Sequence, residues 1–286
     1  MAASTAALRG ITKQYKDFTL GPVDMTVPAG SIVGLIGENG AGKTTLLKIL
    51  CGVNRADDGT VDLLGGSPAD AATRAKIGVV FEDAFFYGSF TAAQVARSLA
   101  GMYGARWNAD SFFAYLRRFG LDAGKKLKEY SRGMRLKLSL AAALAHDPEL
   151  LVLDEATAGL DPVVRGELLD LFLEFIQDER HSIVMSSHIT ADLEQIADSI
   201  AYLHNGQLLF QENKDDLLQE YGVLHCGEDV LTSLPAGLVV FTRRGAYGCE
   251  SLVRERRTVQ ELLPEAVCDA ARLDDIMRFY SGRDAQ

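Results

Sequence analysis

The sequence has few of the features that mark secreted, zinc-binding or membrane-spanning proteins. It has only four cysteines, and none forms a C-x-x-C pair or lies at zinc-ligand spacing from a histidine. These residues, Cys51, Cys226, Cys249 and Cys268, suggest neither a zinc site nor a disulfide framework, and a reducing cytosol fits them best. No apolar run approaches the roughly 18 to 20 residues that cross a bilayer. The first ten residues also lack the basic start and apolar core of a signal peptide.

An excess of positive charge is missing as well. The formal net charge is -10, so a general attraction to nucleic acid or anionic lipid is not expected, although a local basic patch is compatible with it. Internal repeats and low-complexity segments are absent. Hydrophobic residues make up 48% of the chain, enough for one large domain and a smaller appendage. The sequence therefore predicts a globular protein without a nucleic-acid partner.

Short apolar runs alternate with helical patterns along the first two thirds of the chain. Continuous apolar runs predict buried parallel strands at 32–36, 77–81, 150–153 and 183–187. Helical patterns follow at 46–50, 136–145 and 163–176. Strands alternating with helices indicate an α/β fold.

The last third of the chain reads differently. Asn205-Gly206, between apolar runs at 201–203 and 208–210, marks a β-hairpin. We expect a main domain at 1–215, with a helical subdomain at about 84–145, and a small α/β appendage at 216–286. The appendage is predicted to hold strands at 222–226, 237–242 and 249–254 and helices around 259–263 and 272–280, with no chemistry of its own.

The segment GENGAGKTT matches the phosphate-binding pattern G-x-x-x-x-G-K-[ST]. It lies between a predicted strand and a helical pattern, so its backbone N–H groups and the helix dipole can meet a phosphate. Lys43 is expected to reach the β- and γ-phosphates, and the Thr44 hydroxyl to ligate Mg²⁺. The predicted nucleotide-binding residues of this segment are Gly37, Asn39, Gly40, Ala41, Gly42, Lys43, Thr44 and Thr45.

Two carboxylates supply the acidic half of such a site. In LLVLDEATAGLDP, Asp154 stands at the end of a predicted strand, where it can hold a water on Mg²⁺. Glu155 follows and is placed to orient and polarise an attacking water, a role that contributes about 10²- to 10⁴-fold to a rate. Lys43 and Glu155 are therefore predicted to be catalytic.

In this order the motifs resemble the ATP-binding cassette family, and specifically the nucleotide-binding subunit of an exporter-type (ABC-2-like) transporter. The resemblance covers roughly residues 8–210. It implies a P-loop NTPase cassette with a mixed sheet core, flanking helices, an antiparallel β edge and a helical signature subdomain. It also implies that Asp161 in AGLD belongs to the D-loop and that His188 in VMSSHI is a catalytic histidine contacting the γ-phosphate. Tyr15 resembles the aromatic residue that stacks on adenine.

The stretch EYSRGMR, at 129–135, is similar to the family's signature, usually L-S-G-G-Q. It keeps a serine and a glycine in an S-x-G-M variant, which resembles exporters with separately encoded membrane subunits. Alone, it would be an ordinary helix start capped by its serine. In the family the signature meets the nucleotide of a second subunit. The resemblance thus assigns Ser131, Arg132, Gly133 and Met134 to the opposite subunit's ATP.

One position departs from the family in charge. Where a Q-loop glutamine is usual, the chain reads VVFEDAFFY, and Glu82 becomes a third candidate Mg²⁺ ligand beside Thr44 and Asp154. Two outcomes are open: Glu82 ligates the metal, or its charge weakens ATP binding until Arg132 or another base compensates. The aromatic segment at 84–87 is expected either to receive a helix of a membrane subunit or to fill the core of the helical subdomain.

The resemblance implies an ATPase that converts ATP and water to ADP and phosphate, with ATP and Mg²⁺ as cofactors. The implied partners are a second cassette subunit, identical or different, and a separate transmembrane permease. The implied location is cytoplasmic, peripheral on the membrane, and the implied direction is export. The alternative is a soluble cassette ATPase that remodels a macromolecule, although the acidic charge and the single cassette disfavour it.

Overall fold

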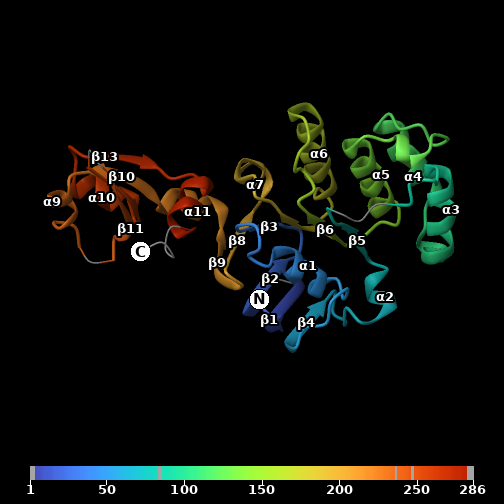
Figure 1. Cartoon of the computed structure of the whole chain (residues 1–286), viewed down its shortest axis with the longest axis horizontal. Helices are drawn as coiled ribbons and strands as arrows, with labels where there is room; N and C mark the ends of the chain where they lie inside the picture. Colours follow the sequence, from blue (N-terminus) through green and yellow to red (C-terminus); the bar gives the residue numbers. More distant parts are fainter. Residues whose placement is uncertain (1–3, 83–85, 236, 246–247, 282–286) are drawn as a thin grey trace. The chain divides into compact units, whose positions relative to one another are not determined.

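The computed structural model describes residues 4–82, 86–235, 237–245 and 248–281 (Figure 1). The chain forms two compact units. The first comprises Met1–Ile189 and Ala201–Phe210, and the second comprises Thr190–Ile200 and Gln211–Gln286. The predicted domain boundary at residue 215 falls inside a helix, α8 (Lys214–Glu220).

A six-stranded sheet with the order β5-β6-β7-β3-β8-β9 is the central layer of the first unit. The pairs β5–β6, β6–β7 and β3–β7 are parallel. Every residue of β3, β6 and β7 is buried, which explains why these strands read as continuous apolar runs. The strands are β3 (Ile32–Ile36), β5 (Ile77–Val80), β6 (Leu150–Asp154), β7 (Ser182–Ser186), β8 (Ser199–His204) and β9 (Gln207–Asn213). The predicted parallel strands are confirmed.

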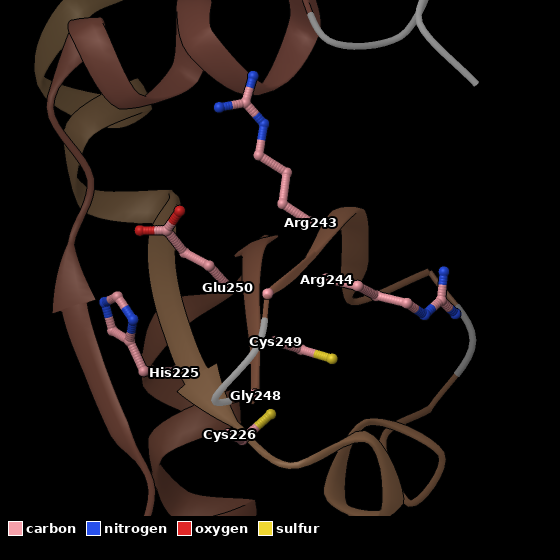
Figure 2. Close-up of a pocket in the computed structure, with 8 residues that line it drawn as sticks. His225, Cys226, Arg243, Arg244, Gly248, Cys249 and Glu250 are labelled. Atoms are coloured by element: carbon pink, nitrogen blue, oxygen red, sulfur yellow. The ribbon is translucent and has the colours of Figure 1, made fainter.

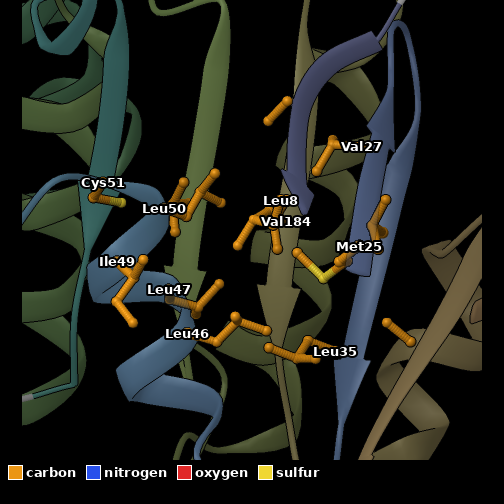
Figure 3. Close-up of a cluster of buried hydrophobic side chains, with 14 of the residues drawn as sticks. Leu8, Met25, Val27, Leu35, Leu46, Leu47, Ile49, Leu50, Cys51 and Val184 are labelled. Atoms are coloured by element: carbon orange, nitrogen blue, oxygen red, sulfur yellow. The ribbon is translucent and has the colours of Figure 1, made fainter. Parts of the chain in front are cut away.

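A second sheet provides the antiparallel edge. In it, β1 (Ser4–Gln14) pairs with β2 (Thr19–Pro28) and with β4 (Asp58–Leu63). Side chains of both sheets form one apolar cluster with the helix α1 (Lys43–Leu50), as Figure 3 shows. Leu46, Leu47 and Leu50 of α1 are fully buried there. This packing fixes α1, and with it the loop that precedes the helix.

The hairpin between β8 and β9 turns at Asn205 and Gly206, whose φ angles are 46° and 80°. Positive φ at both turn residues is what a type I′ turn requires, so the predicted hairpin is confirmed. Gly206 N–H donates to the carbonyl of Ala41 at 3.1 Å, and its carbonyl accepts from Gly21 N–H at 2.7 Å. The hairpin therefore supports the loop that precedes α1.

Replacing Gly206 with alanine is expected to destabilise the fold more than the same change at Gly65. Both residues have positive φ, which costs an L-residue about 1 to 2 kcal/mol. A Cβ on Gly206 would also lie 2.0 Å from the Thr19 carbonyl oxygen, whereas one on Gly65 meets nothing within 4 Å. Relieving that overlap should add about 1 to 3 kcal/mol at Gly206 alone. Urea unfolding of both variants measures the difference, and equal losses would contradict the close packing at the turn.

A helical subdomain with its own core completes the first unit. Its elements are α3 (Ala92–Tyr103), η1 (Gly104–Arg106), α4 (Ala109–Arg118), η2 (Leu127–Glu129) and α5 (Arg132–Leu144). Phe112 is fully buried at the centre of this core. Tyr130 is also buried, and its hydroxyl donates to the Asp122 carbonyl at 2.7 Å, which fixes the start of α5. Two further helices, α2 (Ala71–Arg74) and α6 (Pro162–Phe175), lie outside this subdomain in the chain order.

The aromatic segment expected at 84–87 is described only in part. Ala84 and Phe85 lie outside the described residues. Phe86 packs against the core of the helical subdomain, whereas Tyr87 is 76% exposed. Phe86 thus fits the core-filling interpretation, and Tyr87 remains available at the surface.

The second unit contains a four-stranded antiparallel sheet with the order β11-β12-β10-β13. Its strands are β10 (Gly222–Cys226), β11 (Val239–Gly245), β12 (Gly248–Val253) and β13 (Val267–Ala270). Its helices are α7 (Thr190–Ile196), α8, α9 (Glu228–Leu231), α10 (Arg256–Leu262) and α11 (Leu273–Ser281). The sequence did not predict α7, α8, α9 or β13. In β13 only one of four residues is buried, so no alternating pattern was present to read.

Membrane-crossing helices need about 20 apolar residues. Within the described part of the chain, no helix reaches the length and hydrophobicity that a bilayer span requires.

Candidate functional site

A cavity of about 240 Å³ lies where β3 ends and α1 begins. Gly42 precedes α1 with φ 107°, and no side chain caps this helix. No acidic residue occupies the first turn of α1 either. Because the first N–H groups of a helix lack intrahelical partners and carry the positive end of its dipole, this helix start is an anion site. The cavity is lined by Phe18, Glu38, Asn39, Gly40, Gly42, Lys43, Thr44, Thr45, Glu82 and Glu155.

Most of the nucleotide-binding residues predicted in GENGAGKTT line this cavity, and two of them do not. The Gly37 carbonyl instead accepts from the Lys43 ammonium, and the Ala41 carbonyl accepts from the backbone N–H of Gly206 in the hairpin. Both positions shape the loop through the backbone. The pattern GENGAGKTT thus combines residues that face the cavity with residues that hold the loop.

Lys43 is 6% exposed, and its ammonium has two carbonyl partners in the loop and one carboxylate partner outside it. Its Nζ donates to the carbonyls of Gly37 at 2.7 Å and Glu38 at 3.3 Å. The same atom lies 3.3 Å from Oε1 of Glu155. A buried cation needs such partners, and a phosphate entering the cavity would be a stronger one.

The Thr44 hydroxyl donates to Asp154 Oδ2 at 2.8 Å, and the Ser186 hydroxyl donates to Asp154 Oδ1 at 2.7 Å. Asp154 is only 2% exposed. The contact between Thr44 and Asp154 joins residues 110 positions apart in the sequence. Hydroxyl and carboxylate oxygens are the ligands that a hard cation prefers, so Thr44 and Asp154 fit a Mg²⁺ site.

Ser186 was not among the predicted site residues. It ends β7 and stands directly opposite Asp154 in the parallel register of β6 and β7. Aligning the two predicted strands in this register would have identified Ser186 as a neighbour of Asp154. Its hydroxyl orients the carboxylate of Asp154.

Glu155 adopts φ 52°, a conformation that is strained for a residue with a side chain. Its carboxylate is 11% exposed and lies between two cationic or protonatable groups. Oε2 is 2.6 Å from Nδ1 of His188 and accepts from the His188 backbone N–H at 3.3 Å. The structure therefore brings the three predicted catalytic residues, Lys43, Glu155 and His188, together.

The aromatic wall of the cavity is Phe18 rather than Tyr15. The Phe18 ring lies 2.9 Å from where a Cβ on Gly42 would stand. Tyr15 is 43% exposed and does not line the cavity, but its ring centre is 6.4 Å from that of Phe18. Phe18 was not among the predicted site residues, although it is an aromatic residue three positions beyond Tyr15.

Glu82 lines the cavity but makes its ion pair elsewhere. Its Oε1 accepts from Nη2 of Arg132 at 2.9 Å, and both side chains are about half exposed. The neighbouring acidic residue noted in the sequence, Asp83, lies outside the described residues. A candidate metal ligand is thus paired with a signature residue of its own chain.

The signature and D-loop residues begin helices. The Ser131 hydroxyl caps α5 by accepting from Met134 N–H at 3.2 Å. Asp161 caps α6 in the same way through the N–H groups of Val163 and Val164. A Cβ on Gly133 would meet only a Leu160 methyl group, at 3.6 Å. None of these residues lines the cavity of its own chain.

A separate cavity of about 500 Å³ lies in the second unit, at the ends of β10, β11 and β12 (Figure 2). Cys226 and Cys249 stand opposite each other in the β10–β12 register. Both thiols are free. Burial, and then the neighbouring Cys249, raise the pKa of the Cys226 thiol. This thiol therefore stays protonated at neutral pH.

Comparison with known proteins places these motifs in one family. Residues 20–158 match the family model described as ABC transporter. An uncharacterized ABC transporter ATP-binding protein of Synechocystis is 38% identical over 70% of this chain and 58% of its own length. The bacitracin transport ATP-binding protein of Enterococcus faecalis is 36% identical over 72% of this chain and 68% of its own length. A lantibiotic transport ATP-binding protein of Streptococcus pyogenes is 33% identical over 73% of this chain and 90% of its own length.

Solved structures agree in fold. The ATP-binding subunit of an ABC transporter has a TM-score of 0.68 and 28% identity, covering 75% of this chain and 92% of that one. A dimeric ATP-binding cassette bound to ADP and Pi has a TM-score of 0.66 at 23% identity. The match covers 73% of this chain and 98% of that one. The chain spans less than two thirds of the length of the Synechocystis relative.

Proposed function

The chain belongs to the ABC transporter family of ATP-binding proteins, and we propose that it is the ATP-hydrolysing subunit of a membrane transporter. One observation carries this proposal. At the uncapped start of α1, a buried lysine, a threonine hydroxyl and a glutamate line a single cavity. Asp154 accepts a hydrogen bond from that threonine, and His188 lies 2.6 Å from that glutamate. Each group matches one requirement of phosphoryl transfer to water. The alternative of a soluble remodelling ATPase has no comparable support, since the relatives are transporter subunits.

ATP would bind with its phosphates at the start of α1. The N–H groups of the first turn and the Lys43 ammonium would receive the β- and γ-phosphates. Thr44 and Asp154 would hold Mg²⁺, with Glu82 as a further candidate, and the ion would supply charge neutralisation there. The geometry of Thr44 and Asp154 supports this assignment, because their oxygens already lie 2.8 Å apart.

Glu155 is the proposed base. Its two carboxylate oxygens contact Lys43 and His188. A γ-phosphate would draw Lys43 to itself, which leaves one carboxylate oxygen of Glu155 to orient and polarise a water. His188 would hold the other oxygen and lie close to the departing phosphate. Hydrolysis then needs no covalent intermediate with the protein.

We further propose that two cassettes close over two ATP molecules, with a second copy of this chain as the simplest partner. Ser131 and the N–H of Gly133 would face the γ-phosphate held by the partner. The absence of the signature residues from their own chain's cavity supports that arrangement. ATP would favour the closed pair, and its hydrolysis would release it. That motion would drive a separate permease on the cytoplasmic face of the membrane, in the direction of export.

The function is tested by phosphate release from the purified chain. We expect saturable hydrolysis of ATP that requires Mg²⁺ and stops when EDTA removes the metal. Asp154 is nearly fully buried and its partner Thr44 faces the cavity, so both ligands should stay in place when the metal is removed. Adding Mg²⁺ back should therefore restore the rate. A chain that binds no ATP at millimolar concentration would overturn the proposal.

Tyr15, whose ring centre lies 6.4 Å from that of the cavity-lining Phe18, is the proposed adenine contact. Tyr15→Ala should weaken ATP binding about twofold to tenfold, since aromatic stacking contributes about 0.5 to 1.5 kcal/mol. Binding of inorganic triphosphate, which has no base, should not change. Calorimetric titration of the variant with both ligands separates the two effects. Equal losses for ATP and triphosphate would contradict stacking by Tyr15.

A further inference from the structure

We infer that Glu82 and Arg132 form a releasable link between the two ATP sites of the proposed dimer. ATP and Mg²⁺ bound by one chain would free its Arg132 to contact the triphosphate held by the partner. This role rests on the proposed function and deepens it. Both residues stand where the sequence departs from the family's usual motifs, so the link is a feature of this chain's own residues.

The contact itself is direct. Arg132 Nη2 donates to Glu82 Oε1 at 2.9 Å. Glu82 lines the cavity that also contains Lys43 and Thr44, whereas Arg132 is the first residue of α5 and lies within the signature. On its other side, Arg132 Nη1 is 3.2 Å from where a Cβ on Gly159 would stand. The guanidinium therefore contacts Glu82 of the cavity wall and leaves little room for a side chain at Gly159 of the D-loop.

The position of Arg132 at a helix start favours an anionic partner. The start of a helix carries partial positive charge, so a cation in its first turn is unfavourable. The first turn of α5 contains no acidic residue to offset it. Glu82 supplies that anion within the chain. In the proposed dimer, a γ-phosphate facing the signature would supply a more highly charged one, which a planar guanidinium can bind through two N–H groups.

The ion pair is suited to release. The side chains of Arg132 and Glu82 are 51% and 46% exposed. Half-exposed pairs of this kind contribute little to stability, because water and salt screen them. Carboxylates are ordinary Mg²⁺ ligands, so ATP with Mg²⁺ in the chain's own cavity offers Glu82 a competing partner. Arg132 then loses its anion and becomes available to the partner's nucleotide.

Positive coupling between the two sites follows. Glu82 responds to the nucleotide of its own chain, and Arg132 serves the nucleotide of the other chain. Occupying one site therefore completes the second, and each chain does this for its partner. The wild-type protein should hydrolyse ATP with a Hill coefficient above one, up to a limit of about two for two sites.

The test measures the ATP dependence of hydrolysis by the full chain and its variants. Glu82→Gln keeps a neutral oxygen for the metal but releases Arg132, so the half-saturating ATP concentration should fall about twofold to fivefold. Its Hill coefficient should approach one. Arg132→Gln should lower kcat at least about tenfold, as expected for losing one charge-stabilising donor. Glu174→Gln is the control, because Glu174 makes a similarly exposed ion pair with Arg118, at 2.6 Å, and does not line the cavity.

A charge swap distinguishes the coupling from a purely structural ion pair. Glu82→Arg combined with Arg132→Glu restores the pair but places a carboxylate towards the partner's phosphate. We expect a wild-type melting temperature with kcat still reduced at least about tenfold. Recovery of wild-type kcat, or an unchanged Hill coefficient in Glu82→Gln, would overturn the inference. If the wild-type chain hydrolyses no ATP, the proposed function fails first, so the two failures are distinguishable.

Discussion

Replacing Glu155 by glutamine is expected to slow ATP hydrolysis at least about 100-fold, the lower range for a positioned general base. Glutamine keeps the shape of the side chain and can still contact Lys43 and His188, but it cannot polarise water as a carboxylate does. ATP binding should persist, because Glu155 is not a phosphate contact in the proposed site. Single-turnover hydrolysis and equilibrium ATP titration measure the two properties separately.

The matched control is Glu149→Gln. Glu149 immediately precedes β6, whereas Glu155 immediately follows it, and Glu149 forms a surface ion pair with Lys76 at 3.2 Å. The same chemical change at the other end of the strand should leave hydrolysis unchanged. Near-normal turnover in Glu155→Gln, measured beside this control, would remove Glu155 from the role of base.

The second large effect is expected for Lys43→Met. Methionine retains most of the apolar stem but loses the charge that would meet the β- and γ-phosphates. Hydrogen bonds to charged groups contribute about 1.5 to 3 kcal/mol, so the Kd for ATP should rise about 10- to 100-fold. Hydrolysis at saturating ATP should fall as well, since in the proposed site the same ammonium would lie beside the transferred phosphate. Calorimetric titration and steady-state rates measure these two losses.

Lys48→Met is the control for Lys43→Met because both residues lie on α1. Lys48 Nζ lies 5.6 Å from the Phe81 ring centre and does not line the cavity. Its loss should leave ATP affinity unchanged. If both variants bind ATP equally well, the ammonium of Lys43 does not contact the phosphates.

The central layer of the fold could be predicted because its signals are local. The runs at 32–36 and 150–153 are continuous and apolar since β3 and β6 are buried at every residue. The hairpin was readable because Asn205 and Gly206 are adjacent and both adopt positive φ. The family resemblance, drawn from the order of the motifs, is confirmed by the relatives and by the fold of the solved structures.

Sequence patterns could not predict the contacts between residues that are distant in the chain. Ser186 reaches Asp154 only through the register of β6 and β7. Glu82 and Arg132 are 50 positions apart, and no local pattern pairs them. From the sequence, Glu82 was expected to add charge to the site, which a base such as Arg132 could compensate. The 2.9 Å distance between the two side chains is the structural finding.

The most direct test of the whole account is the solution mass of Glu155→Gln, measured by light scattering with and without ATP and Mg²⁺. Blocking hydrolysis should trap the closed pair, in which Lys43 of one chain and Ser131 of the other enclose the same nucleotide. The account predicts that the mass doubles when ATP and Mg²⁺ are present and returns to that of one chain when they are removed. A mass that stays at one chain while bound ATP is demonstrated in the same sample would contradict the pairing of identical cassettes.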